Sequence, residues 1–190
     1  MKICLFFGSF NPVHTGHLII ANHVLNLMVF EEIWFIVSPQ NPFKDNNQLL
    51  DEKNRLRLVK KAISGNDRLK VSNIEFKLSR PSYTINTLSY LKEKYPDHKF
   101  SIIMGSDSFQ QLDKWKSFGE IIPNYKILIY CRPGFKVEDK LNADAEILNS
   151  PLLGISSTGV RELIRNGKSI RYLVPEKVRK EIIENQYYKK

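Results

Sequence analysis

The sequence predicts an α/β protein of the Rossmann-like, doubly wound class, in which a mostly parallel sheet carries helices on both faces. Two observations support this prediction. Short apolar runs alternate along the chain with stretches of helical periodicity, which is the order that builds βαβ units. In the first forty residues, an apolar run at 3–7 precedes a helical stretch at 18–28 and a second apolar run at 33–37, so the chain opens with one such unit.

Four runs are predicted to be strands because they are apolar with few interruptions, as expected of parallel strands buried on both faces; they cover 3–7, 33–37, 100–104 and 126–131. Residues 69–74 are predicted to be a further strand because apolar and polar residues alternate there. Helices are predicted where apolar residues recur at helical spacing, and they cover 18–28, 51–63, 84–95, 158–166 and 176–185. A short helix is expected after the turn at 105–108. Residues 135–144 are predicted to form a polar surface loop, and no strand is predicted between 132 and 151.

The length of 190 residues suits one domain, of which residues 158–190 are expected to form a C-terminal helical extension. Capping signals mark the two helices of this extension. Ser156 and Ser157 suit the N-cap of the first helix, and Asn166-Gly167 suits its end. Pro175 is well placed to begin the second helix.

The composition excludes several classes of protein. No apolar run approaches the roughly 20 residues of a membrane span, and the run before Gly8 is too short for a signal peptide. The two cysteines, Cys4 and Cys131, have no metal-ligand spacing and indicate buried thiols in a reducing compartment. A cytoplasmic enzyme is therefore expected. The net charge of +9 indicates a solvated basic surface, a site for polyphosphate or a nucleic-acid partner.

Residues 8–17, GSFNPVHTGH, join the first predicted strand to the first predicted helix. The backbone N–H groups at a helix start and the positive end of its dipole favour anions. The imidazoles of His14 and His17 can donate hydrogen bonds to phosphate oxygens, and Gly8 and Gly16 let the main chain approach a ligand. This segment predicts nucleotide chemistry. Polar residues of three other turns are expected at the same sheet edge, namely those in 38–44, 105–107 and 155–161.

Two motifs near opposite ends of the chain resemble signatures of the nucleotidylyltransferase superfamily. The segment His14-Thr15-Gly16-His17 is similar to the HxGH signature, and residues 155–161, ISSTGVR, are similar to the ISSTxxR signature. Further matches resemble the bacterial nicotinate mononucleotide adenylyltransferase family and extend the likeness from residue 1 to about 165; they are 8–14, 82–84, 105–107 with Trp115, and 132–134.

The resemblance implies an enzyme of NAD biosynthesis whose substrates are ATP and nicotinate mononucleotide. A 5′-phosphate oxygen of the mononucleotide attacks the α-phosphorus of ATP, giving nicotinate adenine dinucleotide and pyrophosphate. Because a phosphate monoester is already ionised near neutral pH, the reaction needs no general base, and catalysis depends on alignment and on neutralising charge. Mg²⁺ is expected to arrive bound to ATP, and no metal site built by the protein is expected.

The resemblance also implies roles for individual residues. His14 and His17 would bond the α- and β-phosphate oxygens, Arg161 would hold the β- and γ-phosphates, and Lys44 would contact the transferring phosphate. The loop that contains Lys44 departs from many relatives, which have a histidine before the lysine. The implied ATP-binding set adds Gly8, Ser9, Phe10, Gly105, Asp107, Ile155, Ser156 and Ser157.

The acceptor pocket implied by the resemblance consists of Thr84, Trp115, Lys116 and Arg132. A nicotinate carboxylate only accepts hydrogen bonds, so it would take them from the Thr84 hydroxyl and the main-chain N–H near Lys116. Trp115 would stack on the pyridine ring. Structural alternatives exist for two residues, because Asp107 also suits a helix N-cap and Trp115 also suits a core or lid aromatic.

Two other functions stay open on the sequence alone. The chain could be a nucleotidylyltransferase for nicotinamide mononucleotide or phosphopantetheine, although Thr84, Trp115 and the turn at 105–107 argue against this. A nucleic-acid-binding module would need basic and aromatic residues interleaved in a patch, whereas the Tyr and Phe residues lie mostly inside apolar runs. We therefore expect no nucleic-acid or membrane partner, and homo-oligomer formation stays open.

Overall fold

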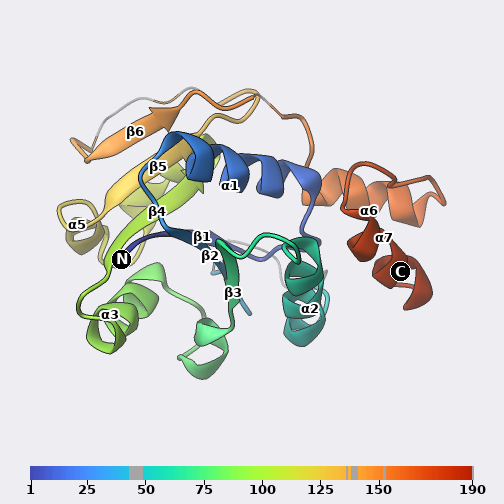
Figure 1. Ribbon diagram of the computed structural model, residues 1–190, viewed down its shortest axis with the longest axis horizontal. Helices are drawn as coiled ribbons and strands as arrows, with labels where there is room; N and C mark the ends of the chain where they lie inside the picture. Colours follow the sequence, from blue (N-terminus) through green and yellow to red (C-terminus); the bar gives the residue numbers. More distant parts are fainter. Residues whose placement is uncertain (43–48, 136, 138–140, 152, 190) are drawn as a thin grey trace.

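A single six-stranded sheet forms the centre of the computed structural model, which describes residues 1–42, 49–135, 137, 141–151 and 153–189 (Figure 1). Every neighbouring pair of strands is parallel, and their order is β3-β2-β1-β4-β5-β6. This arrangement confirms the predicted Rossmann-like, doubly wound class. The strands are β1 (Lys2–Gly8), β2 (Glu32–Val37), β3 (Leu69–Ser72), β4 (Lys99–Gly105), β5 (Lys126–Tyr130) and β6 (Ala145–Leu148).

The long helices agree with the predicted ranges to within a few residues at each end. Asp51 caps the second helix by accepting from the backbone N–H of Lys53 at 2.9 Å, and Ser156 caps the sixth by accepting from that of Gly159 at 3.1 Å. The helices are α1 (Thr15–Leu27), α2 (Glu52–Ala62), α3 (Thr84–Lys94), α4 (Ser106–Phe109), α5 (Phe118–Ile121), α6 (Ser157–Arg165) and α7 (Glu176–Glu184), with 3₁₀ turns η1 (Ile74–Lys77) and η2 (Leu112–Lys114).

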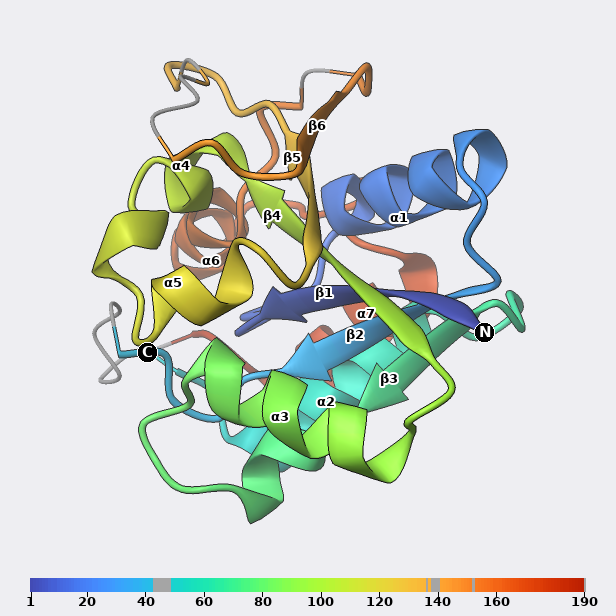
Figure 2. The same cartoon turned by 90° about the vertical axis from the view of Figure 1, so that its left-hand side faces the viewer.

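Two hydrophobic clusters cover the two faces of the sheet. Along β1, Cys4 and Phe6 belong to one cluster, which they share with apolar residues of α1, α2, α6 and α7. Ile3 and Leu5 belong to the other, which they share with residues of α3, α4 and α5. Helices α3 and α5 lie toward the viewer in Figure 2. Burial on both faces explains why β1 is apolar without alternation.

The sequence prediction misses β6. This edge strand consists of Ala145, Glu146, Ile147 and Leu148 and pairs with β5 alone. Of these four residues only Leu148 is buried, and Ile147 is 54% exposed. A short edge strand with one buried side chain has neither an apolar run nor a clear alternation, so its pairing partner rather than its own sequence makes it a strand.

The order in which the chain adds strands to the sheet reverses between β1 and β4. β1 pairs with β2 on one side and with β4 on the other, and Phe6 of β1 lies opposite Ile103 of β4. In open α/β sheets, ligands bind beyond the carboxyl ends of the strands at such a point. Both strands end here in glycine, at Gly8 and Gly105.

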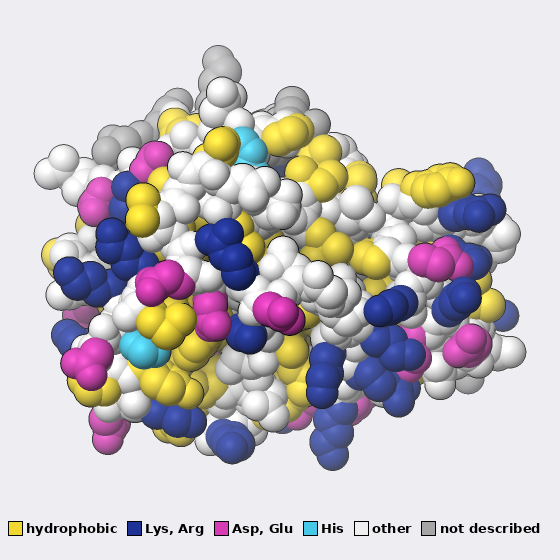
Figure 3. Space-filling model, in the orientation of Figure 1, with side chains coloured by type: hydrophobic (Ala, Val, Ile, Leu, Met, Phe, Trp, Pro, Cys, Tyr) yellow, Lys and Arg dark blue, Asp and Glu magenta, His cyan; other side chains and the backbone are white. Residues whose placement is uncertain are grey.

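The C-terminal helices pack on the same sheet face as α1 and α2, since Val160, Val178 and Ile182 belong to the same apolar cluster. Glu181 of α7 pairs with Arg57 at 2.7 Å and also with Lys61, both on α2. Lys and Arg side chains gather over α2 and these helices in Figure 3. Part of the basic charge on this face is therefore compensated within the protein.

Two smaller expectations are also answered by the structure. Cys4 is buried as expected, whereas Cys131 is only half-buried, because it follows the last residue of β5. Among the helices of the described residues, none has the length and the apolar composition that crossing a membrane requires.

Candidate functional site

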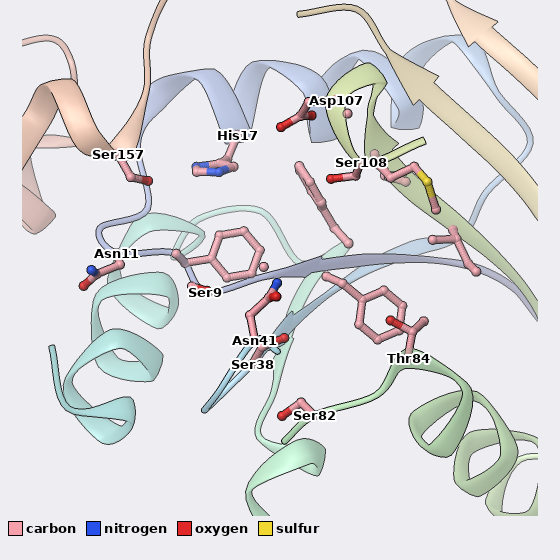
Figure 4. Close-up of a pocket in the computed structure, with 18 of the residues that line it drawn as sticks. Ser9, Asn11, His17, Ser38, Asn41, Ser82, Thr84, Asp107, Ser108 and Ser157 are labelled. Atoms are coloured by element: carbon pink, nitrogen blue, oxygen red, sulfur yellow. The ribbon is translucent and has the colours of Figure 1, made fainter. Parts of the chain in front are cut away.

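A cavity of about 450 Å³ lies at the carboxyl edge of the sheet, between the turns that follow β1 and β4 (Figure 4). Most of the site residues expected from the sequence line it. Ile155 does not; it lies beside Gly16. Lys44 falls outside the described residues. The expected residues that line the cavity are Gly8, Ser9, Phe10, His14, His17, Thr84, Gly105, Asp107, Trp115, Lys116, Arg132, Ser156, Ser157 and Arg161.

The turn after β1 folds back on itself beneath the cavity. Phe10 has a φ of 45° and is a buried residue, 3% exposed. The ring lies so close to Gly8 that a Cβ there would stand 2.9 Å from Phe10 Cζ. The same ring meets that of His17 edge to face, with centroids 5.1 Å apart. Gly8 therefore permits the packing that supports one wall of the cavity.

The two histidines stack on each other at the start of α1. Their ring centroids are 3.7 Å apart, with 27° between the planes. The backbone N–H of His14 donates to His17 Nδ1 at 3.2 Å. Because Nδ1 accepts this bond, a neutral His17 ring carries its proton on Nε2. The His17 ring points from α1 into the cavity (Figure 4).

The start of α1 offers fewer backbone donors than the sequence suggests. The N–H of Thr15 donates to the Leu173 carbonyl at 2.8 Å, and the N–H of His17 donates to the His14 carbonyl at 3.0 Å. Two of the first N–H groups of this helix are thus already engaged. An anion in the cavity would depend more on the side chains of this turn than on its backbone.

His14 is buried and is uncharged at neutral pH. Burial, and then the positive charge of Arg132, lower the pKa of His14 from 6.5 to about 4. Its Nδ1 is buried and has no hydrogen-bond partner among the described residues. At neutral pH, His14 therefore offers the cavity a hydrogen-bond donor rather than a positive charge.

The low pKa of His14 predicts that acid destabilises the fold. An unfolded chain takes up a proton at this residue near pH 6.5, whereas the folded chain does so only near pH 4. This contribution to stability is therefore complete above pH 6.5 and is lost as the pH falls toward 4, by roughly 2 kcal/mol between pH 7 and pH 5. We expect His14→Gln to remove that part of the pH dependence, as measured by urea unfolding at the two pH values. Identical losses in the two proteins would contradict the assignment.

Arg161 enters the cavity from α6 and is held from the N-terminal turn. Its guanidinium donates to the Asn11 carbonyl at 2.8 Å, and a second contact joins it to Thr158 Oγ1 at 3.3 Å. The hydroxyl of Ser157 donates to the Pro12 carbonyl at 2.9 Å. These bonds dock the start of α6 against the turn after β1. The two sequence motifs therefore meet in space, on the same side of the cavity.

Asp107 and Arg132 form an ion pair on the opposite wall. Arg132 Nη1 lies 3.3 Å from Asp107 Oδ2, and the hydroxyl of Ser106 accepts from the backbone N–H of Arg132 at 2.9 Å. Asp107 does not cap α4, whose N-cap is Gly105. Its Oδ1 is buried without a partner in the described part of the chain, so it can accept from a ligand hydroxyl.

Gly105 leaves the room that Asp107 occupies. A Cβ at position 105 would stand 2.3 Å from Asp107 Oδ1 and 3.0 Å from Arg132 Nε. Gly105→Ala is therefore expected to displace the carboxylate. Since the resemblance implies that Asp107 binds ATP, we expect KM for ATP to rise roughly tenfold, the cost of one lost hydrogen bond. Steady-state kinetics with varied ATP measure this effect. The control is Gly119→Ala, where a Cβ meets no atom within 4 Å, and equal KM values in the two variants would contradict the prediction.

Thr84, Trp115 and Lys116 lie toward the α3 side of the cavity. Thr84 is the first residue of α3. Trp115 packs against the cluster on that face of the sheet and also lines the cavity, so its packing and its place at the site go together. Lys116 Nζ lies 4.7 Å from the centre of the Tyr83 ring. A hydroxyl, an indole and a cation thus surround this part of the cavity.

Comparison with known proteins leads to the same kind of protein as the sequence motifs. A family model described as cytidylyltransferase-like matches residues 5–163. The chain belongs to this family. Curated relatives include probable nicotinate-nucleotide adenylyltransferases of Christiangramia forsetii, 47% identical, and Cytophaga hutchinsonii, 45% identical, each over 192 residues and covering 99% of this chain and 98% of the relative.

Solved structures of other proteins share the fold. A Plasmodium falciparum nicotinic acid mononucleotide adenylyltransferase complexed with NaAD superimposes with a TM-score of 0.83 at 21% identity, covering 98% of this chain and 97% of that one. A Vibrio parahaemolyticus protein described as a nicotinate-nucleotide adenylyltransferase gives 0.73 at 21% identity, covering 100% and 96%. Together with the sequence relatives, these findings confirm the resemblance found in the sequence and establish the chain as a nucleotidyltransferase.

Sequence reasoning missed several residues of this nucleotidyltransferase site. Glu75 lies outside every segment that the sequence placed at this edge, and Ser108 lies one residue beyond the turn at 105–107. Five further polar residues lie within the predicted segments but were not singled out; they are Asn11, Ser38, Asn41, Ser82 and Thr158. Tyr83 and Tyr130 also line the cavity. A signal existed for one residue beneath the site, Arg55, because it precedes Leu58 and Val59 at helical spacing and so belongs to the buried face of α2.

Proposed function

We propose that this protein transfers the adenylyl group of ATP to nicotinate mononucleotide, releasing pyrophosphate and forming nicotinate adenine dinucleotide. One observation carries the proposal. A single cavity brings His14, His17 and Arg161 to one side and Thr84 and Trp115 to another. A triphosphate and a pyridine mononucleotide bound at these two places would have their reacting phosphates between them.

The phosphate side of the cavity can stabilise the charge that moves during the reaction. An oxygen of the acceptor phosphate attacks the α-phosphorus, and the bond from that phosphorus to the oxygen bridging to the β-phosphorus breaks. Negative charge then grows on the departing pyrophosphate. The proton on His17 Nε2 and the guanidinium of Arg161 are the groups that we assign to this charge, because both line the cavity on fixed helices. Lys44 is proposed to contact the transferring phosphate.

The acceptor side suits a ligand with a carboxylate. The α3 helix has eleven residues, and its positive dipole end begins at Thr84. The Thr84 hydroxyl can donate a hydrogen bond, and Lys116 supplies a nearby positive charge. A nicotinamide group would need an acceptor as well as donors. This combination supports nicotinate over nicotinamide as the acceptor base.

The divalent ion is proposed to enter with ATP as part of the substrate. Within the ranges that the structure describes, no three His, Cys, Asp or Glu side chains group closely enough to hold a metal ion. Mg²⁺ usually binds through substrate phosphates with several retained waters, so it needs few protein ligands. The ion would neutralise phosphate charge alongside Arg161. We also propose that the protein acts in the cytoplasm.

Pyrophosphate release from ATP tests the proposed function. The assay compares nicotinate mononucleotide, nicotinamide mononucleotide and phosphopantetheine as acceptors, each with Mg²⁺ and with EDTA. We expect the highest kcat/KM with nicotinate mononucleotide, and we expect no pyrophosphate release in EDTA. A higher kcat/KM for another acceptor would replace the proposed substrate. Tight RNA binding at physiological salt without any nucleotidyl transfer would overturn the proposal.

A further inference from the structure

Glu75 is a buried carboxyl in the cavity wall that the proposed mechanism does not use. It belongs to η1, is 2% exposed and lines the cavity. The hydroxyl of Thr87 donates to Glu75 Oε1 at 2.8 Å. Burial raises the pKa of Glu75, while the hydroxyls of Thr87, Ser38 and Ser82 lower it, in that order. Three side chains from different parts of the chain therefore meet at this carboxyl.

The three hydroxyls come from three segments that build the acceptor side of the cavity. Ser38 follows the end of β2, Ser82 precedes α3, and Thr87 lies one helical turn after Thr84. The backbone N–H of Ser82 donates to the Gln40 carbonyl at 2.9 Å, which joins the first two segments. Figure 4 shows Ser38, Ser82 and Thr84 on the same side of β1, across from His17 and Asp107.

Stability alone does not explain a carboxyl at this place. Glu75 Oε2 and Ser82 Oγ are both buried, and neither has a hydrogen-bond partner at good geometry in the described part of the chain. A buried carboxyl with one unsatisfied oxygen costs free energy, and an apolar side chain of similar size would avoid that cost. Local rules of this kind are broken most often at functional sites.

We infer that Glu75 is a positioning residue for the acceptor side, which holds Thr84 in place through Thr87 and lies against the Ser38 hydroxyl after β2 and the Ser82 hydroxyl before α3. The inference rests on the proposed function. The cluster of Glu75, Thr87, Ser38 and Ser82 meets an assigned ATP-binding residue through the main chain, because the backbone N–H of Ser38 donates to the Gly8 carbonyl at 2.9 Å. That bond does not involve the Glu75 carboxyl. Loss of the carboxyl should therefore weaken acceptor binding and leave ATP binding nearly unchanged.

The test compares KM for nicotinate mononucleotide with KM for ATP in Glu75→Leu and Glu75→Gln. Leucine removes every acceptor that the hydroxyls use, and we expect KM for the mononucleotide to rise about tenfold while KM for ATP changes by less than about twofold. Glutamine keeps an oxygen for Thr87 and should restore KM to within about threefold of the wild-type value. A residue that only supports the fold would not produce this split or this rescue.

Glu181→Gln is the matched control. Glu181 is also buried, at 5% exposed, but it lies on α7, pairs with Arg57 and Lys61, and does not line the cavity. It should change the melting temperature without separating the two KM values. If Glu75→Leu does not fold, Thr87→Val tests the inference instead. Valine removes the hydroxyl and keeps nearly the same side-chain volume, and it should raise KM for the mononucleotide roughly threefold.

Two results would overturn the inference: an unchanged KM for the mononucleotide in a folded Glu75→Leu or Thr87→Val protein, or equal rises in both KM values. A wild-type protein that released no pyrophosphate with nicotinate mononucleotide would overturn the proposed function, and the inference with it. The wild-type assay therefore separates the two failures.

Discussion

Replacing His17 by alanine should lower kcat by about two to three orders of magnitude, the usual loss when one donor to a transition state is removed. The ring points into the cavity, its Nδ1 already accepts from the His14 backbone, and its proton therefore lies on Nε2. This donor gains strength as negative charge grows on the phosphates. Binding of ATP in the ground state should suffer less, so kcat should fall more than KM rises.

His23→Ala serves as the control for the His17 prediction. His23 lies on the same helix and does not line the cavity, so its removal should leave kcat unchanged. Because His17 also packs against the rings of Phe6 and Phe10, circular dichroism and a melting temperature must accompany the kinetics. A folded His17→Ala protein that kept wild-type kcat would show that the proposed role is wrong.

The proposed chemistry depends on contacts that join the two ends of the chain. His14 and His17 come from the first turn of the fold, and Arg161 comes from α6, yet Arg161 donates to the Asn11 carbonyl and Ser157 donates to the Pro12 carbonyl. The backbone just before the first motif thus anchors the side chains of the second. A change in either motif is expected to affect both.

Much of the fold could be predicted because strands that are buried on both faces have apolar sequences. β1 and β4 are apolar throughout their centres since helices cover both sides. The same logic fails for β6, where a single side chain, Leu148, reaches the core. β6 is a strand because it pairs with β5, and no pattern in its own sequence predicts this pairing.

The site residues also fall into those that the sequence predicts and those that only the structure reveals. Gly8, His14 and His17 lie within one short segment, so their chemistry could be inferred together. Glu75 has no such local partner, because it meets Ser38 only when η1 packs beside the end of β2. Single polar residues of this kind are ordinary in any surface loop, and only the tertiary structure shows that they share a cavity.

Arg55 is expected to carry a large part of the stability of the loops around the site. It is 1% exposed, and its guanidinium donates to four backbone carbonyls, those of Ser9 at 2.6 Å, Leu50 at 2.7 Å, Ser38 at 2.8 Å and Pro39 at 3.1 Å. Burial lowers the pKa of Arg55, although Arg stays charged at any ordinary pH. One side chain therefore holds the turns after β1 and β2 together from beneath the cavity.

Arg55→Met should destabilise the protein by about 4 kcal/mol or more, because methionine fills the space but leaves four carbonyls without their donor, at about 1 kcal/mol or more each. Chemical unfolding measures this loss against Arg57→Met on the same helix. The Arg57 side chain is 50% exposed, so its loss should destabilise the protein much less. Arg55→Lys is informative as well, since one ammonium cannot reach carbonyls arranged around a planar fork. If Arg55→Met were as stable as Arg57→Met, the turns would have to be held by other contacts, and the geometry of the phosphate side would no longer depend on α2.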